Sequence, residues 1–375
     1  MRRRLNFERL WEPGVSGLRA PLWAALTPLA ALYAGALGLR AQWWRVMADS
    51  SPVATVSVGN LTLGGNGKTP FTLFLARRLR THGHRIAIVS RGYGRDNQHG
   101  PMLVADGGKL LLPISAAGDE PAMMARAFDG PIAVARRRLD AINLLVARGP
   151  LDAIILDDAF QHRRLRRDLD LLLVGARRGF GNGWLLPAGP LREPRSAIRR
   201  ADAIVEVSPA WADACTIASR DRAGLEGLPS LRATLTPHAL IQASPHGWSE
   251  SPLELNGRRV VAVCGLADPQ GFRAMLEHLG AKIVKAFAYP DHHRYRPEDW
   301  REIVAAAPAA DLVITTEKDL IKLEGFSPQP AALYAVRLKV AMDDADEARL
   351  LAMVAEVIKA RRAQAASGTH PATPS

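Results

Sequence analysis

The amino-acid sequence predicts an α/β protein: a P-loop NTPase-type parallel-sheet domain, a second and smaller α/β domain, and an N-terminal membrane-associated helix. Three observations carry this prediction. A glycine-rich segment ending in Gly-Lys-Thr follows an apolar run, several later apolar runs end in polar residues, and a long uncharged segment lies near the start. The chain has 375 residues, which is enough for two domains.

Five segments are expected along the chain. They are a basic segment and membrane-associated helix over residues 1–46, a P-loop domain over 47–210, an inter-domain connection over 211–237, a second α/β domain over 238–362 and a disordered tail over 363–375. Scattered prolines and a loosened apolar pattern predict the connection. Small residues and prolines predict the tail.

The formal net charge is +12, from 49 Lys and Arg residues against 37 Asp and Glu residues. Such a charge favours phosphorylated partners: a nucleotide, a nucleic acid or an anionic membrane. The basic residues are not interleaved with an aromatic stacking platform, so we expect no nucleic-acid partner. Cys215 and Cys264 lack the spacing of a metal site or a redox motif, and we expect buried thiols.

The segment Ala20–Leu39 carries no charged residue and is flanked by arginines and tryptophans. Pro28 and the many alanines weaken it as a membrane-spanning helix. A helix lying in the membrane interface is the favoured interpretation, with a true span and an ordinary buried helix as alternatives. A cleavable signal is disfavoured because Arg40 and bulky residues follow it. Each interpretation places the following domain in the cytoplasm.

A strand, a glycine-rich loop and a helix are expected in succession over residues 53–83. The run VATVSVGN predicts the strand, and TPFTLFLARRLRTHG has the apolar spacing of a helix with a glycine stop. The segment between them departs from the usual P-loop pattern because Thr62 stands where a glycine is common. We expect it to bind a nucleotide through Thr62, Gly64, Gly65, Asn66, Gly67, Lys68 and Thr69.

The chemistry of these residues suits the phosphates of ATP. Glycines let backbone amides approach the β- and γ-phosphates, Lys68 supplies a positive charge, and Thr69 offers a hydroxyl to Mg²⁺. A glycine-rich turn that happens to contain these residues is the alternative. We refer to residues 62–69 as the phosphate loop.

Asp157 and Asp158 follow the apolar run of LDAIILDD directly. A P-loop enzyme needs a carboxylate at the end of a neighbouring strand to organise Mg²⁺. We therefore expect one of the two carboxylates near the metal and the other in a structural role. Capping of a following helix is the alternative.

A kinase also needs a group that accepts or orients the proton of the acceptor hydroxyl. Asp119 and Glu120 stand where a helix is expected to begin, and an N-cap followed by a first-turn acid is an equally good interpretation. PDHHRY places His292 and His293 in a loop after a strand of the second domain. A catalytic or substrate-orienting histidine is favoured there over a solvent-facing loop, and a metal site lacks a third ligand nearby.

Several segments, taken in order, resemble the tetraacyldisaccharide 4'-kinase family of lipid A biosynthesis. They are VGNLTLGGNGKTP, SRGYGR, GDEPAMMA, LDDAFQHRRLRRDLDLLL, GNGWLLPAGPLREP, PDHHRY and TTEKDLIKL, behind an apolar N-terminal helix. The resemblance covers roughly Met1 to Leu323. It departs from the family pattern at Ala159, where a glycine is expected.

The resemblance implies transfer of the γ-phosphoryl group of ATP, with Mg²⁺, to the 4'-hydroxyl of tetraacyldisaccharide 1-phosphate. It assigns Lys68 to the phosphates, Asp119 as the base toward the hydroxyl and His292 as its partner from the second domain. It assigns the metal to Thr69, Asp157 and Asp158. Supporting or substrate contacts are implied for Tyr93, Gln161, Asn182 and Arg192.

The implied partners are the lipid substrate and the anionic surface at the cytoplasmic face of the bacterial inner membrane, and no protein partner is evident. Two other hypotheses stay open. A membrane-associated nucleotide switch would hydrolyse ATP to change a partner contact. A nucleic-acid-dependent ATPase would be stimulated by DNA or RNA.

Overall fold

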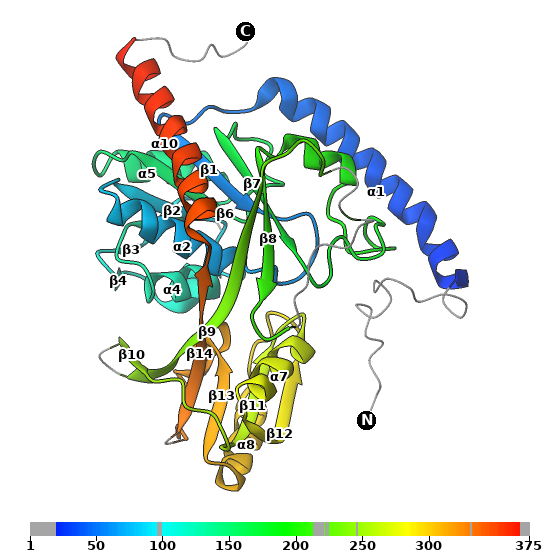
Figure 1. The fold of residues 1–375 in the computed structure, drawn as a ribbon, viewed down its shortest axis with the longest axis vertical. Helices are drawn as coiled ribbons and strands as arrows, with labels where there is room; N and C mark the ends of the chain where they lie inside the picture. The colour runs from blue at the N-terminus through cyan, green and yellow to red at the C-terminus, as the bar shows by residue number, and fades with distance from the viewer. Residues whose placement is uncertain are drawn as a thin grey trace.

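The computed structural model describes residues 20–95, 100–212, 221, 225–244, 247–330 and 332–367. Its strands belong to two lobes joined by two long strands (Figure 1). The first lobe contains β1 (Ala54–Gly59), β2 (Ile86–Ser90), β3 (Met102–Asp106), β4 (Lys109–Leu110), β5 (Ile132–Val134), β6 (Ala153–Asp157), β7 (Leu169–Gly175) and β8 (Ala203–Pro209). The long strands are β9 (Ser230–Ser244) and β14 (Leu333–Ala341), and the second lobe adds β10 (Gly247–Ser251), β11 (Arg259–Gly265), β12 (Lys282–Tyr289) and β13 (Leu312–Thr316).

Helices cover the sheet of each lobe. They are α1 (Ala20–Met47), α2 (Lys68–Thr81), α3 (Ile114–Ala117), α4 (Asp119–Ala125), α5 (Arg138–Val146), α7 (Pro269–His278), α8 (Pro297–Ala306), α9 (Glu317–Leu323) and α10 (Asp344–Ala366), with 3-10 turns η2 (Arg195–Arg200) and η3 (Ala307–Ala309). The strands of the described ranges form one 14-stranded sheet in the order β12-β11-β13-β14-β9-β8-β7-β1-β6-β2-β5-β3-β4, with β10 paired to β9.

The central strands of the first lobe are parallel and buried on both faces. In β6, Ala153 and Ile155 pack in the same cluster as apolar residues of α2, whereas Ile154 and Leu156 pack in the cluster that contains residues of α5. Successive side chains of a strand point to opposite faces, so an uninterrupted apolar run is what a doubly covered strand requires. The predicted parallel α/β domain is present.

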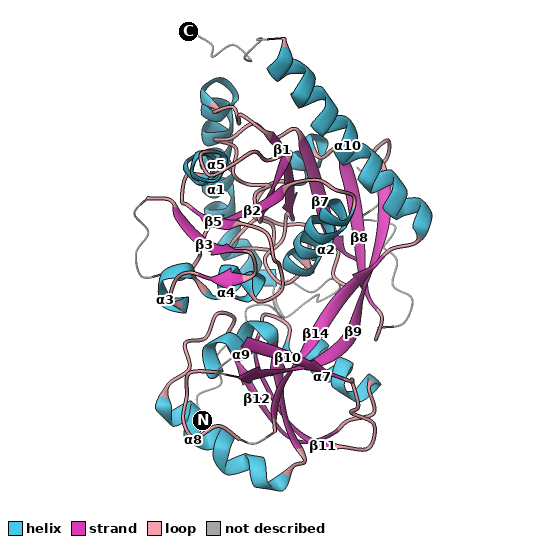
Figure 2. Cartoon of the chain, turned by 90° about the vertical axis from the view of Figure 1, so that its left-hand side faces the viewer, coloured by secondary structure: helices cyan, strands magenta, loops and turns pink. Residues whose placement is uncertain are grey.

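The two long strands correct the expected connection over residues 211–237. Residues 230–237 form the first half of β9, which pairs with β8 of the first lobe, and β9 then continues beside β14 and β10 (Figure 2). Pro237 faces Leu338 where the register of β9 and β14 shifts. A strand tolerates proline at such an irregularity, so the prolines do not mark a loop here.

Helix α10 corrects the expected boundary at residue 362. Its apolar residues Leu350, Val354 and Ile358 belong to the core of the first lobe, and Arg361 lies 2.7 Å from Asp168 of that lobe. The last part of the chain therefore returns to the first lobe. The helix continues through Ala366, four residues into the expected tail, and residues 368–375 lie outside the described residues.

Helix α1 lies along the outside of the first lobe (Figure 1). Ala30, Tyr33 and Leu37 lie at helical spacing and are buried or half-buried. Its other side exposes Leu29, Leu32, Leu39, Trp43, Val46 and Met47. No helix within the described ranges combines the length and apolar character needed to cross a bilayer. Residues 1–19 lie outside those ranges.

Candidate functional site

The phosphate loop connects the end of β1 to the start of α2. Gly67 has a φ of 70°, and a Cβ atom there would lie 2.9 Å from the Leu235 side chain. Gly64 also has a positive φ, of 107°. Both positions therefore require glycine, and they leave the first N–H groups of α2 open toward the loop. Such a helix start is a site for an anion.

Lys68 is held in place from two sides. Its Nζ donates to Asn60 Oδ1 at 2.9 Å and lies 3.4 Å from Asp158, which in turn lies 2.9 Å from Arg192. Burial acts to raise the pKa of Asp158, but the charges of Lys68 and Arg192 lower it to about 2. Asp158 is therefore a permanent anion that fixes two cations beside the loop.

Asp157 has a different environment. It ends β6 and accepts a hydrogen bond from the Thr72 hydroxyl at 3.0 Å. Burial raises the pKa of Asp157 to about 7, and the negative charges of Glu120 and Asp158 add to this rise. Residues after the pair form turns, so the alternative that the pair caps a helix is wrong. Although the two carboxylates are adjacent, their surroundings raise the pKa of Asp157 and lower the pKa of Asp158.

Within the described part of the chain, no group of three or more His, Cys, Asp or Glu side chains is arranged to hold a metal ion alone. Mg²⁺ that also binds phosphate oxygens needs only one or two protein carboxylates. Asp157 fits this role because it is crowded by two other negative charges. Thr69, in the first turn of α2, follows Lys68 directly.

Helix α4 brings two acids to the carboxyl edge of the first-lobe sheet. Its N-cap is Gly118, so Asp119 and Glu120 are first-turn residues and the N-cap interpretation of Asp119 is wrong. Asp119 lies 3.6 Å from Lys322, and Glu120 lies 3.6 Å from Lys318. Both lysines belong to α9 of the second lobe. These ion pairs join the lobes at the site.

His292 faces the first lobe. Its ring meets the ring of Tyr93 edge-on, with 4.9 Å between the centroids, and its Nε2 lies 3.2 Å from Lys318 Nζ. Burial lowers the pKa of His292, and the Lys318 ammonium lowers it further. Burial acts to lower the pKa of Lys318 as well, but Glu120 and Asp291 raise it above its ordinary value. A neutral imidazole therefore accepts a hydrogen bond from a charged lysine.

His293 is half-buried and makes its contacts within the second lobe. Its Nε2 lies 2.8 Å from Asp299, and its ring stacks on Tyr289 with 4.5 Å between centroids. His292 is therefore the histidine of the pair that the fold directs to the lobe contact.

Two candidate residues have an unusual backbone. Among the described residues, Asp158 and His292 are the non-glycine residues with positive φ, at 45° and 58°. A non-glycine residue in this region costs about 1–3 kcal/mol and persists where the surrounding structure fixes it. Such positions concentrate at functional sites, and these two lie on opposite lobes.

The remaining predicted contacts divide into two groups. Tyr93 and Arg192 lie at the site as described, and Gln161 Nε2 donates to the Asn60 carbonyl at 2.7 Å. Asn182 instead donates to Ala188 O at 2.9 Å and holds a turn.

The sequence-based prediction missed three residues of this network. Asn60 directly follows β1, and the sequence marks it only as a polar residue after an apolar run. Lys318 and Lys322 lie four residues apart in TTEKDLIKL, a spacing that places them on one face of a helix. That spacing was a usable signal.

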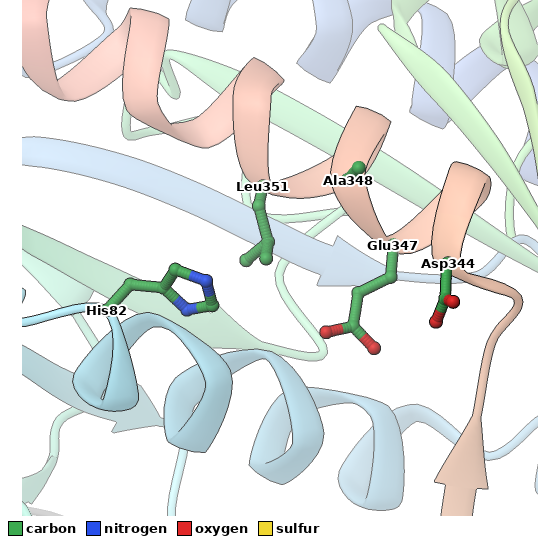
Figure 3. Close-up of a pocket in the computed structure, with 5 residues that line it drawn as sticks. All are labelled: His82, Asp344, Glu347, Ala348 and Leu351. Atoms are coloured by element: carbon green, nitrogen blue, oxygen red, sulfur yellow. The ribbon is translucent and has the colours of Figure 1, made fainter.

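A separate hollow of about 360 Å³ lies between α2 and α10 (Figure 3). It is lined by His82, Asp344, Glu347, Ala348 and Leu351. His82 follows the last residue of α2, whereas the phosphate loop precedes the first, and a helix of 14 residues is about 21 Å long. This hollow is therefore distinct from the site described above.

Comparison with known proteins identifies the family. The profile of the family described as Tetraacyldisaccharide-1-P 4'-kinase matches residues 22–359. The tetraacyldisaccharide 4'-kinase of Anaeromyxobacter sp. (strain K) is 41% identical over 91% of each chain, and that of Syntrophus aciditrophicus is 38% identical over 92% of this chain and 97% of its own. The crystal structure of LpxK from Aquifex aeolicus in complex with ATP is 32% identical, covers 90% of this chain and 99% of its own, and superposes with a TM-score of 0.71.

These comparisons confirm the predicted P-loop NTPase-type α/β fold with its N-terminal helix, and the resemblance found in the sequence. The association of that helix with a membrane stays a prediction. The match extends from α1 through most of α10, so it includes both lobes and the contact between them. The chain belongs to the tetraacyldisaccharide 4'-kinase family.

Proposed function

We propose that the reaction takes place between the two lobes, with the ATP phosphates on the phosphate loop and the sugar acceptor beside Asp119. The chain is a kinase of lipid A biosynthesis, as its family and relatives are. It transfers the γ-phosphoryl group of ATP to the 4'-hydroxyl of tetraacyldisaccharide 1-phosphate. The observation that supports this placement most is the contact of Tyr93 with His292, which brings the second lobe to the carboxyl edge of the first-lobe sheet.

On the donor side, Lys68 and the open amides of the phosphate loop bind the β- and γ-phosphates. Thr62, Gly64, Gly65, Asn66 and Gly67 shape this loop, and Asn66 donates to the Thr62 hydroxyl at 2.8 Å. Thr69 and Asp157 would hold Mg²⁺, while Asp158 keeps Lys68 and Arg192 in position. When bound, Mg²⁺ supplies positive charge to the phosphate oxygens.

On the acceptor side, Asp119 takes the proton of the 4'-hydroxyl. The oxygen of that hydroxyl forms a bond to the γ-phosphorus, while the bond between the γ-phosphorus and the ADP oxygen breaks. His292 supports Asp119 from the second lobe, in the neutral form that its surroundings favour. Tyr93, which is 60% exposed, contacts the acceptor, and Gln161, Asn182 and Arg192 hold the surrounding loops.

The outer side of α1 lies on the cytoplasmic face of the bacterial inner membrane. Three observations support this part of the proposal. Leu32 and Leu39 are each 73% exposed, Trp43 is 62% exposed, and the chain carries a net charge of +12 that suits an anionic surface. The acyl chains of the acceptor can then stay in the bilayer while its sugars reach Asp119 at the contact between the lobes.

The experiment is transfer of labelled γ-phosphate to purified tetraacyldisaccharide 1-phosphate in detergent micelles with Mg²⁺. We expect labelled lipid from the wild type and from Lys359→Ala, an exposed lysine of α10. Lys68→Ala loses about 10²–10³-fold in kcat/KM, as for loss of one preorganised charge contact. Free phosphate without labelled lipid would refute the lipid-kinase proposal and favour the nucleotide switch.

A further inference from the structure

Tyr33 and Arg40 of helix α1 each donate a hydrogen bond to a loop that flanks the phosphate loop. Tyr33 donates its hydroxyl hydrogen to the carbonyl of Arg192 at 3.0 Å. Arg40 donates from Nη2 to the carbonyl of Gln161 at 3.3 Å. The two donors are seven residues apart, which is about two helical turns, so both point from one side of α1 toward the first lobe.

The first hydrogen bond leads to Lys68 through Arg192. The backbone N–H of Arg192 donates to Leu61 O at 2.7 Å, immediately before the phosphate loop. Its guanidinium contacts Asp158, and Asp158 pairs with Lys68. Arg192 therefore lies between α1 and the donor site. Its carbonyl accepts a hydrogen bond from α1, and its N–H donates one to the residue before the phosphate loop.

The second hydrogen bond leads to Lys68 through Gln161. The side chain of Gln161 donates to Asn60 O at 2.7 Å, and Asn60 Oδ1 accepts from Lys68 at 2.9 Å. Two chains of contacts thus start on α1 and meet at one ammonium group.

The segments that carry these contacts have little regular structure of their own. Residues 158–164 and 182–194 contain no helix and no strand in the described structure. A loop without regular structure samples more conformations, and a hydrogen bond from a rigid helix reduces that freedom before a ligand arrives.

We infer that Tyr33 and Arg40 are positioning residues that hold the phosphate loop ready for ATP. The inference rests on the proposed role of Lys68 as a phosphate ligand. Helix α1 then has two roles, since its outer side faces the lipid and its inner side fixes the flank of the donor site. Neither residue touches the reacting atoms.

The test is the dissociation constant for ATP, measured by isothermal titration in detergent without lipid acceptor, together with KM for each substrate. Tyr33→Phe keeps the ring and removes only the hydroxyl, and Tyr33→Phe/Arg40→Met removes both hydrogen bonds. We expect the double variant to weaken ATP binding and raise KM for ATP by about three- to tenfold, the range for one or two ordinary hydrogen bonds. KM for the lipid and the melting temperature stay unchanged.

The matched control is Tyr334→Phe/Arg301→Met, which makes the same changes in the second lobe, where Tyr334 is half-buried and Arg301 is exposed. ATP affinity equal to that of the wild type in the α1 double variant would overturn the inference. A rise in the lipid KM alone would also overturn it, because it would assign both residues to acceptor binding.

Lys68→Ala separates this inference from the proposed function. If Lys68→Ala binds ATP as the wild type does, the proposed donor site fails. If Lys68→Ala weakens ATP binding while the α1 variants do not, only the positioning role fails.

Discussion

The proposed donor and acceptor halves of the site are built in different ways. In the donor half, Lys68, Asp158 and Arg192 all belong to the first lobe and are joined by ion pairs within it. In the acceptor half, Asp119 pairs with Lys322 across the contact between lobes. A substitution in the donor half therefore acts inside one folded lobe, whereas a substitution in the acceptor half also acts on how the two lobes meet.

The largest effect on activity is expected from Asp119→Asn. Removing the proposed base lowers kcat by about 10²–10⁴-fold, while ATP affinity stays at the wild-type value because the donor half is intact. Single-turnover transfer and ATP titration measure the two quantities on one sample. Glu120→Gln is the matched variant one residue away, and we expect a smaller loss of kcat from it. An equal loss of ATP affinity in Asp119→Asn would show that the halves are not separate.

A smaller effect is expected from Lys318→Met, which removes the cation that contacts Glu120, Asp291 and His292. Misplacement of a supporting group by about 1 Å can lower a rate by about 10²-fold. The pKa of His292 also rises, since the ammonium that lowers it is gone. We therefore expect the acidic limb of the pH–rate profile to move to higher pH.

Lys282→Met changes an exposed lysine of β12 and is the control for Lys318→Met. A lower rate with an unmoved acidic limb in Lys318→Met would separate His292 from catalysis and leave Lys318 with a purely structural role.

The smallest expected effect is on the pH dependence of the free energy of unfolding. It tests whether Asp157 and Asp158 differ in pKa. The folded-state pKa of Asp157 is about 7, above the ordinary 3.8, so between these values the folded chain holds a proton that the unfolded chain has lost. Without ATP and Mg²⁺, its contribution to the free energy of unfolding is fully present below about pH 4 and is lost as the pH rises through 7. Each pKa unit corresponds to about 1.4 kcal/mol.

Asp157→Asn removes this dependence. Urea unfolding at pH 5 and pH 8 should show the variant gaining about 1–3 kcal/mol relative to the wild type at the higher pH. The same stability difference at both pH values would mean that Asp157 is already ionised in the folded protein.

Local patterns made the donor half predictable from the sequence. A strand, the phosphate loop and α2 follow one another, and Asp157 ends an apolar strand, so residue order alone brings Lys68 and Asp157 to one edge of a parallel sheet. The acceptor half depends on contacts between distant segments. Asp119 was a candidate, but its partner Lys322 comes from the other lobe, and no local pattern links them.

The single sheet that runs through both lobes was not predictable either, because it also depends on contacts between distant segments. The pairing of β9 with β14 joins residues far apart in the chain. Pro237 within β9 is typical of a loop, so the sequence pattern does not indicate a strand there. The packing of α10 on the first lobe could not be predicted from the sequence either. The apolar stripe of α10 predicts that the helix covers a core, but it does not specify which of the two lobes provides that core.

The packing of α10 on the first lobe has a consequence for the order in which the protein can form. The core of the first lobe needs Leu350, Val354 and Ile358, which follow the entire second lobe in the chain. During synthesis from the N-terminus, the ribosome has released α1 and the phosphate loop long before these residues exist. The first lobe therefore stays incomplete, with apolar surface uncovered, until almost the whole polypeptide has been made.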